Sequence, residues 1–448
     1  MFRLDLKVAA VVLSLAAGTY AFAQTPATPE VRAAIEAEYG VKDAVVKYDT
    51  YSEMMADPDR MGGEYFMLPF DDVRLTPAPK GYKPVYISHI GRHGARFATD
   101  EKIYENLMGI FTKAHDKGKL TEAGEDLFRR YRAFYPSVAL QGGELTHKGQ
   151  AQHRGIADVM FESFPEVFKG KTRAEVQSTT TPRVIMSMLS FTNELKNLDG
   201  DISFNFECSK KLLPDIHPNS ASNPNRVKVK IPAKANAQVD SLLASRINLK
   251  DFCSNYFNDT DYLSKSYGLY DFVNDLRSVI VDLQCLDFEP ADKFSDVFTH
   301  EQLFGLWEAR NYSGYLRMGR SPVTGGKGCM SCAAVLRNMI ECADRDLASG
   351  DVQLSLRFSH DIAVLPLVSY MKVDNFGAVV NDPGDVKNWW RCDFMPMAAN
   401  FQMIFYRSKH DPEILVKVLF NGHEASLPIP QVAPSFYSWT AIKDYYKD

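Results

Sequence analysis

Hydrophobic and polar residues follow two periodicities along this chain, and the two alternate. Runs typical of β-strands occur at VYIS (85–88), AEVQST (174–179), VQLSLRFS (352–359), FQMIFYR (401–407) and EILVKVLF (413–420). Stretches with helical periodicity lie at 29–39, 101–140, 147–164 and 182–195. Thr28, Thr146 and Pro182 stand where three of these helices would begin, as is usual for threonine and proline.

The pattern changes between residues 208 and 328. Polar loops such as HPNSASNPN alternate there with helical stretches, and strand signals are few. Strands that alternate with helices on both sides of this segment indicate an α/β protein. We therefore predict a central, mostly parallel sheet flanked by helices, formed by residues 24–207 and 329–448. Residues 208–328 would form a mostly helical insert, or cap.

The N-terminus has the three parts of a secretory signal peptide. Two basic residues, Arg3 and Lys7, lie near the start of the chain, and an apolar run follows at 8–18. The sequence AFA, with a small residue on each side of phenylalanine, then forms a cleavage site that ends at Ala23. The apolar run is too short to span a bilayer. We expect residues 1–23 to be removed and the mature protein to be periplasmic or secreted.

Composition and charge narrow the range of partners. Hydrophobic residues make up 45% of the chain and charged residues 24%, which is ordinary for a globular protein. The formal net charge of −5 becomes −6 once Arg3, Asp5 and Lys7 are removed with the signal peptide. An acidic protein is a poor general binder of nucleic acid. If the protein binds anions, it needs a local cationic pocket.

The chain has seven cysteines, and outside the cytoplasm they would be in an oxidising compartment. They are Cys208, Cys253, Cys285, Cys329, Cys332, Cys342 and Cys392. We expect disulfides with one cysteine left over, and the pairing stays open. The C-x-x-C pair of Cys329 and Cys332 has no second ligand pair at a suitable spacing, so we predict no metal site.

Candidate chemistry gathers at three strand-to-helix junctions. Their charged or titratable residues are Arg92, His93, Arg96, Arg183, His360 and Asp361. In α/β sheets, ligands bind beyond the carboxyl ends of the strands, so these side chains would lie together at one binding site. Arginine forks match phosphate oxygens, a histidine can attack phosphorus, and a protonated carboxyl can protonate the leaving oxygen.

The pieces of this pattern differ in specificity. R-H-G-x-R at 92–96 is rare by chance, whereas the dipeptide His-Asp occurs three times in the chain. His115-Asp116 lies within a helical stretch, and His410-Asp411 precedes a proline. Only the pair at 360–361 follows an alternating strand and opens an apolar helix, so context selects it.

These motifs closely resemble those of the histidine acid phosphatases, branch 2 of the histidine phosphatase superfamily. That family includes phytases, glucose-1-phosphatases and multiple inositol polyphosphate phosphatases. RHGAR (92–96) and SHD (359–361) carry the resemblance, and GELTHKGQAQ (143–152) and STTTPR (178–183) extend it to about residues 80–445. It implies a phosphoglycerate-mutase-like α/β core, a helical domain over the site, and no metal or other cofactor.

The resemblance also implies a role for each site residue. His93 would be the nucleophile that becomes phosphohistidine, and Asp361 the proton donor. The phosphate would be bound by Arg92, Arg96, Arg183 and His360. The implied activity is hydrolysis of phosphomonoesters, on inositol polyphosphates such as phytate or on other small organic phosphates.

The chain departs from the family pattern at two positions. Ala98 stands where the family often has proline. Inositol polyphosphate phosphatases usually have His-Ala-Glu where this chain has His-Asp at 360–361. The second difference leaves open a broad-specificity sugar-phosphate phosphatase. A non-catalytic binder of phosphorylated ligands and a mutase that transfers the phosphoryl group between hydroxyls would use a similar pocket.

One further cationic segment is RVKVK, residues 226–230. If it is a strand, Arg226, Lys228 and Lys230 share one face, and this strip would help to recognise a polyanionic substrate. A solvated edge strand is the alternative. His89, His147 and His153 lie near the motifs and are interpreted as structural or supporting residues. The oligomeric state stays open.

Overall fold

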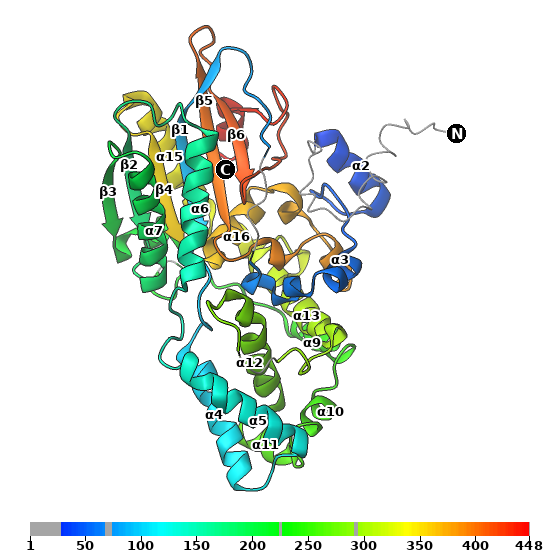
Figure 1. Cartoon of the computed structure of the whole chain (residues 1–448). Coiled ribbons are helices and arrows are strands. Elements are labelled where there is room, and N and C mark those ends of the chain that lie inside the picture. The colour runs from blue at the N-terminus through cyan, green and yellow to red at the C-terminus, as the bar shows by residue number, and fades with distance from the viewer. Residues whose placement is uncertain (1–27, 68–73, 224–225, 291–293, 448) are drawn as a thin grey trace.

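The computed structural model describes residues 28–67, 74–223, 226–290 and 294–447 (Figure 1). The predicted signal peptide, residues 1–23, lies outside the described residues. In the described part, eight strands form a single sheet in the order β3-β2-β4-β1-β5-β6-β7, and β8 pairs with β6. The strands are β1 (Tyr82–Arg92), β2 (Arg173–Ser178), β3 (Ser203–Cys208), β4 (Leu354–Ser359), β5 (Asn400–Ser408), β6 (Leu415–Phe420), β7 (His423–Glu424) and β8 (Tyr437–Ser438).

The two halves of the sheet differ in direction. β3, β2, β4 and β1 run parallel, whereas β5 pairs antiparallel with β1, and β6, β7 and β8 continue in that manner. The predicted α/β fold with a central sheet flanked by helices is confirmed. The sheet is mixed rather than mostly parallel, because parallel pairing is confined to β3, β2, β4 and β1, the half that carries the candidate chemistry. The carboxyl ends of β1, β2 and β4 therefore lie at one edge.

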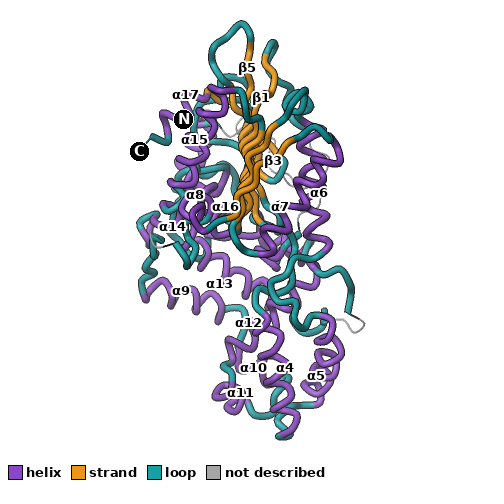
Figure 2. The backbone as a smooth tube through the Cα atoms, turned by 90° about the vertical axis from the view of Figure 1, so that its left-hand side faces the viewer, coloured by secondary structure: helices purple, strands orange, loops and turns teal. Residues whose placement is uncertain are grey.

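Helices cover both faces of the sheet (Figure 2). One face is covered by α6 (His147–Ser163) and α7 (Pro182–Leu198), and the other by α8 (Leu213–Ile216), α15 (Ala333–Ser349) and α16 (Asp361–Tyr370). As predicted, α6 starts after Thr146, whose hydroxyl accepts from the Gly149 N–H at 3.2 Å. Pro182 occupies the first position of α7. The backbone N–H at this position has no acceptor within the helix, so proline, which has no N–H, loses no hydrogen bond there.

A second, helical part lies beyond the carboxyl edge of the parallel strands (Figure 1). It contains α4 (Glu101–Asp116), α5 (Glu122–Phe134), α10 (Leu249–Ser254), α11 (Thr260–Ser266) and α12 (Leu269–Asp282). One apolar cluster joins α4 and α5 to α12, for example through Phe111 and Phe272, whose ring centroids lie 5.6 Å apart. The helical part thus draws on residues 97–138 as well as on part of the insert 208–328.

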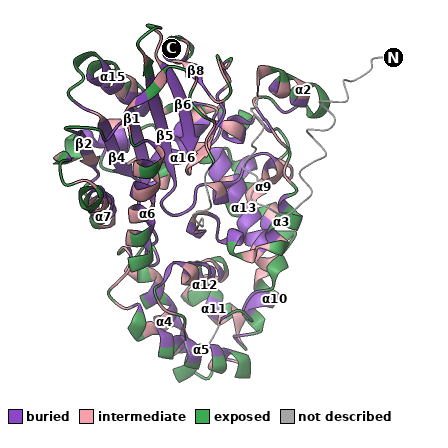
Figure 3. Ribbon diagram, turned by 45° about the horizontal axis from the view of Figure 1, so that its top comes forward, coloured by how far each residue is buried: buried purple, intermediate pink, exposed green. Residues whose placement is uncertain are grey.

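The remaining helices lie in the N-terminal segment, between the sheet and the helical part, and at the C-terminus. They are α2 (Pro29–Tyr39), α3 (Thr50–Ala56), η1 (Pro58–Tyr65), η2 (Tyr135–Ser137), η3 (Lys210–Leu212), α9 (Ala233–Ala244), η4 (Leu283–Cys285), α13 (His300–Met318), η5 (Pro322–Thr324), α14 (Lys327–Met330), η6 (Asp374–Gly377), η7 (Val386–Asn388), η8 (Cys392–Phe394) and α17 (Trp439–Tyr445). Figure 3 shows the inner strands β1, β4, β5 and β6 as buried and exposed faces on the outer helices. Among the helices described, none combines the length and apolarity that a bilayer crossing requires.

The segment 226–230 is not the strand that its alternation suggested. Arg226, Lys228 and Lys230 lie in an exposed, irregular stretch before α9. A strand needs a neighbour with which to form hydrogen bonds, and the described part of this segment pairs with none. The prediction that the three cations share a strand face is therefore wrong.

The predicted disulfides are also absent, and all seven cysteines are free thiols. The neighbours Cys329 and Cys332 direct their sulfurs at different backbone carbonyls, those of Gly326 and Ala363, each at 3.4 Å. A disulfide needs its two sulfurs about 2 Å apart. Six of the thiols are buried and Cys208 is exposed, and Cys253, Cys285 and Cys332 belong to different apolar clusters.

Candidate active site

The candidate site lies where β1, β2 and β4 end. The last residue of β1, Arg92, is paired in register with Ser359, the last residue of β4. Ser178 ends β2 beside Phe358 of β4. Each strand is thus followed directly by one of the three predicted motifs. The structure brings together Arg92, His93, Arg96, Arg183, His360 and Asp361.

His93 is almost fully buried at the centre of this group. Its Nδ1 lies 3.0 Å from the carbonyl oxygen of Gly94. A carbonyl oxygen only accepts, so Nδ1 carries the proton and Nε2 keeps a free lone pair. Burial lowers the pKa of His93 well below its usual value, and Arg92 and Arg183 lower it further. The imidazole is therefore neutral, even at acidic pH.

Arg92 and Asp361 form an ion pair across the site. The guanidinium Nη2 lies 3.4 Å from Asp361 Oδ2, and its Nη1 donates to the carbonyls of Glu64 and Met395 at 2.6 and 2.9 Å. Asp361 is the first residue of α16, where its Oδ1 accepts from the Ile362 N–H at 2.8 Å. Burial would raise the pKa of Asp361, but Arg92 and this N–H hold it below its usual value.

Arg96 and Arg183 complete a cationic wall. Arg96 donates to the Phe97 carbonyl at 2.8 Å, and its guanidinium carbon lies 4.9 Å from the centre of the Tyr65 ring. Arg183 donates to the Gly143 carbonyl at 3.3 Å. Burial and the neighbouring Arg96 lower the pKa of Arg183 to about 10, which leaves it charged at neutral pH. Three arginines therefore face one small space.

The His360 ring lies beside that of His93, with ring centroids 5.5 Å apart. Its Nε2 is 3.2 Å from the Thr179 hydroxyl and 3.4 Å from the Thr181 hydroxyl, both of which belong to the loop between β2 and α7. The His217 ring lies 4.5 Å from the His360 ring. Burial, followed by His217 and the arginines, lowers the pKa of His360 well below its usual value. His360 is therefore a neutral hydrogen-bonding group.

Several residues that support the site are not indicated by the sequence motifs. Glu64 and Tyr65 come from η1, far upstream of the RHGAR segment, and hold Arg92 and Arg96 as described above. His217 comes from the loop after α8. Of the cations at 226–230, Arg226 is close enough to contribute to the lowered pKa of His217.

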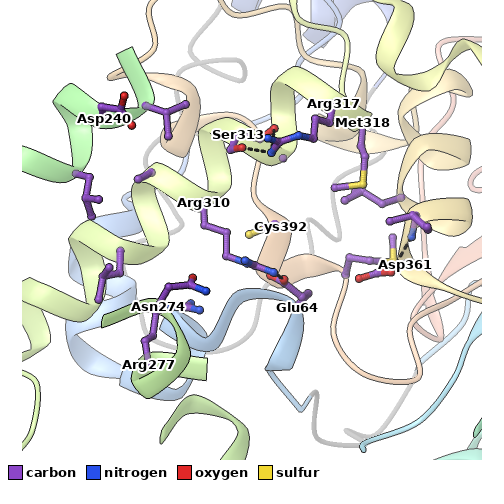
Figure 4. Close-up of a pocket in the computed structure, with 18 of the residues that line it drawn as sticks. Glu64, Asp240, Asn274, Arg277, Arg310, Ser313, Arg317, Met318, Asp361 and Cys392 are labelled. Carbon is purple, nitrogen blue, oxygen red and sulfur yellow. Dashed lines mark hydrogen bonds and ion pairs between the residues drawn. The ribbon is translucent and has the colours of Figure 1, made fainter. Parts of the chain in front are cut away.

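A cavity of about 320 Å³ opens beside Asp361, between α9, α12, α13 and α16 (Figure 4). Arg277, Arg310 and Arg317 line it, together with the acidic residues Glu64 and Asp240. Arg310 reaches Glu64 with its Nε at 2.6 Å, as Figure 4 shows. The cavity shares Asp361 with the candidate site, and its walls are both apolar and charged.

The residues around the site do not resemble a metal centre. Within the described ranges, no group of three or more His, Cys, Asp or Glu side chains is arranged to hold a metal ion. Around His93 and His360 stand three arginines, Arg92, Arg96 and Arg183, and Asp361 is paired with one of them. This donor set suits an anion and not a cation.

Two more histidines are buried directly behind the site. His89 on β1 and His153 on α6 are 0% exposed, and none of their ring nitrogens has a hydrogen-bond partner among the described residues. Both pack against the Phe358 ring. Burial lowers the pKa of each to about 3.

This burial predicts a loss of stability in acid. Between pH 6.5 and about 3 the unfolded chain binds protons at His89 and His153 that the folded chain does not, so stability is full above pH 6.5 and falls as the pH drops. The free energy of unfolding falls by at most about 1.4 kcal/mol per pH unit for each histidine.

Urea unfolding at pH 7.0 and 4.5 measures this effect. Between these two pH values, the free energy of unfolding of the His89→Leu/His153→Leu variant should fall less than that of wild type. Exposed His115→Leu is the control and should keep the wild-type slope; an unchanged slope in the double variant would contradict the assignment.

Comparison with known proteins agrees with the fold and the motifs. The sequence profile of the histidine phosphatase superfamily (branch 2) matches residues 87–421. No curated protein matches the sequence significantly. Among solved structures, the chain is similar to the multiple inositol polyphosphate phosphatase of Bifidobacterium longum in its apo form, with a TM-score of 0.73 and 18% identity over 87% of this chain and 97% of that one.

Two further solved structures have the same fold. The complex of the Bifidobacterium longum enzyme with inositol hexasulfate gives a TM-score of 0.71 at 18% identity, over 87% of this chain and 97% of that one. The phytase from D. castellii gives a TM-score of 0.62 at 15% identity, over 87% of this chain and 84% of that one. Because the profile covers most of the chain, the protein belongs to branch 2 of the histidine phosphatase superfamily and is a histidine acid phosphatase.

Proposed function

We propose that the protein hydrolyses phosphomonoesters through a phosphohistidine at His93, and that its substrates are inositol polyphosphates. The observation that carries the mechanism is the arrangement around the imidazole: a free Nε2, three arginines beside it, and the Asp361 carboxyl on the helix that faces it. Arg92, Arg96, Arg183 and His360 would bind the phosphoryl oxygens. Their charges and N–H groups stabilise the transition state.

In the first step, His93 Nε2 forms a bond to phosphorus while the bond from phosphorus to the ester oxygen breaks. Asp361 in its protonated form gives its proton to the departing oxygen. The pKa of Asp361 is low while Arg92 lacks a competing anion. A bound phosphoryl group offsets the positive charge of the arginines, so the carboxyl gains a proton more readily in the complex.

In the second step, water attacks the phosphorus of the phosphohistidine. Asp361, now a carboxylate, accepts a proton from that water, and the bond between phosphorus and His93 breaks. Inorganic phosphate leaves, and Nε2 regains its lone pair. The low pKa of His93 supports this cycle at acidic pH, because the imidazole stays neutral where Asp361 is more easily protonated.

The cavity beside Asp361 supports a substrate that carries more than one phosphate. Arg310 and Arg317 on α13 and Arg277 on α12 line it and would bind further anionic substituents. The B. longum phosphatase, which has the same fold, is a multiple inositol polyphosphate phosphatase and was solved with inositol hexasulfate bound. Sugar phosphates are the second candidate, because Glu64 and Asp240 in the same lining offset part of the positive charge.

Phosphate release from matched substrates tests this proposal. We expect kcat/KM for inositol hexakisphosphate to exceed that for glucose 1-phosphate by about tenfold or more, since each added charge-assisted hydrogen bond contributes about 1.5–3 kcal/mol. Activity towards an aryl phosphate should be unchanged by a chelator. Arg317→Ala should reduce the preference while sparing the aryl phosphate. A higher kcat/KM for the sugar phosphate would favour the second candidate.

A further inference from the structure

The carboxylate of Glu64 already binds an arginine that a second phosphate of the substrate would need. Glu64 belongs to η1, and its Oε1 accepts from both Nε and Nη2 of Arg310 on α13, with the Nε contact at 2.6 Å (Figure 4). Nε and Nη2 form an edge with which arginine binds a carboxylate or a phosphate. While this ion pair holds, that edge of Arg310 is closed to a substrate phosphate.

The pair lies on the wall of the cavity that opens beside Asp361. Glu64, Arg310 and Asp361 all line this cavity of about 320 Å³. The Arg310 side chain is 43% exposed and that of Glu64 15% exposed, so the guanidinium is accessible to an anion in the cavity. Burial would raise the pKa of Glu64, but Arg310 holds it below its usual value. Glu64 is therefore ionised at neutral and mildly acidic pH.

The two ends of Glu64 contact two different arginines. Its main-chain carbonyl accepts from Arg92 Nη1 at 2.6 Å, and the same guanidinium pairs with Asp361 through Nη2 at 3.4 Å. Its carboxylate, at the other end, pairs with Arg310. Rotation about the side-chain bonds of Glu64 would therefore release Arg310 and leave the carbonyl on Arg92.

The cavity wall also has unused capacity to bind an anion. Arg277 on α12 lines the same cavity and is 1% exposed. Its Nη2 donates to the Met61 carbonyl at 2.7 Å, but its Nε and Nη1 have no hydrogen-bond partner among the described residues. Buried N–H groups are normally paired, and those of a guanidinium suit phosphate oxygens. The surroundings of Arg310 thus favour an anionic ligand, for which Glu64 is the competitor.

We propose that Glu64 is a specificity-determining residue, whose carboxylate competes with a second substrate phosphate for Arg310. A substrate with several phosphates must displace this carboxylate, whereas a substrate with one phosphate need not. Glu64 therefore limits the advantage that polyphosphates have over monophosphates. The proposal rests on the proposed function in one respect, because it takes the cavity as the place where further phosphates bind.

Two sulfate probes of different size test the proposal by binding alone: inositol hexasulfate and inorganic sulfate. Calorimetry gives the Kd of each probe for wild type, Glu64→Gln, Arg310→Ala and the double variant. In Glu64→Gln, which keeps the shape of the side chain and removes its charge, the Kd of the hexasulfate should fall by about fivefold or more relative to that of sulfate. Glu64→Ala, which removes the carboxylate altogether, should give the same shift.

The double variant shows whether the effect acts through Arg310. Without Arg310, loss of the Glu64 charge should leave the ratio of the two Kd values unaltered, because no competition remains. Glu301→Gln is the matched control: Glu301 lies on α13 and pairs with Arg246 at 3.3 Å, but it is not part of the cavity lining. That variant removes the same charge and should keep the wild-type ratio.

The possible failures are distinguishable. An unchanged or weaker relative affinity for the hexasulfate in Glu64→Gln would contradict the proposal, as would an equal gain with and without Arg310. If wild type binds neither probe and phosphate does not inhibit turnover, the phosphate site itself is wrong, and the proposal with it. If the variants behave as expected but sugar phosphates are the better substrates, the role of Glu64 stands and only the assignment of inositol polyphosphates fails.

Discussion

Replacing His93 by alanine is expected to lower kcat by about 10⁴-fold or more, because the variant lacks the atom that bonds to phosphorus. His93 is the histidine of the described site whose Nδ1 faces a backbone carbonyl, which leaves Nε2 free, and Arg92 and Arg183 help to keep its pKa low. His360 cannot replace it without moving, because its Nε2 is already within hydrogen-bond distance of two threonine hydroxyls. Initial rates with an aryl phosphate measure the effect.

The loss must come from chemistry and not from misfolding. The His93→Ala variant should retain its circular dichroism spectrum and still bind sulfate, since the arginines remain. His115→Ala, an exposed histidine on α4, should keep wild-type activity. If His93→Ala kept more than about one hundredth of kcat, a nucleophile would be the wrong role for it, since losing a nucleophile costs far more. A protein that only binds phosphorylated ligands would show no turnover even as wild type.

Asp361→Asn is expected to affect esters according to how readily their alcohol leaves. For alkyl phosphates, whose leaving oxygen needs a proton, kcat/KM should fall by about 10²–10⁴-fold. For 4-nitrophenyl phosphate, which leaves as a stable anion, the loss in kcat/KM should stay below about tenfold. We choose kcat/KM because it reports the first, phosphoryl-transfer step and not the later attack by water.

The comparison of two esters also separates proton transfer from simple electrostatics. Asp361→Asn removes the ion pair with Arg92, but this change acts on both substrates equally. Only a role in protonating the leaving oxygen makes the loss depend on the alcohol. Equal losses for the alkyl and aryl esters would show that Asp361 only orients Arg92.

Much of the active site could be predicted from sequence because each motif follows a strand directly. The chain leaves β1 at Arg92, β4 at Ser359 and β2 at Ser178, and parallel neighbouring strands end at the same edge. Local pattern was therefore sufficient to bring residues that are far apart in the chain to one place. The helix starts at Thr146 and Pro182 were predictable for a similarly local reason.

The supporting residues could not be predicted, because tertiary packing alone brings them to the site. Glu64, Tyr65 and His217 carry no motif, and they come from segments whose path depends on tertiary packing. The same limit explains the error at residues 226–230. Alternation of Val and Lys is typical of a strand, but whether a strand forms depends on a neighbour that no local pattern reveals.

The central claim, that His93 is phosphorylated during turnover, is tested most directly by trapping the intermediate. In Asp361→Asn, 4-nitrophenyl phosphate should phosphorylate the enzyme faster than water can remove the group, because the second step lacks its base. An alkaline quench in the first turnover, followed by peptide mass spectrometry, should find about one phosphoryl group per chain, on the peptide containing His93 and on that imidazole. A phosphoryl group on any other residue, or turnover with no phosphorylated enzyme under these conditions, would contradict the account.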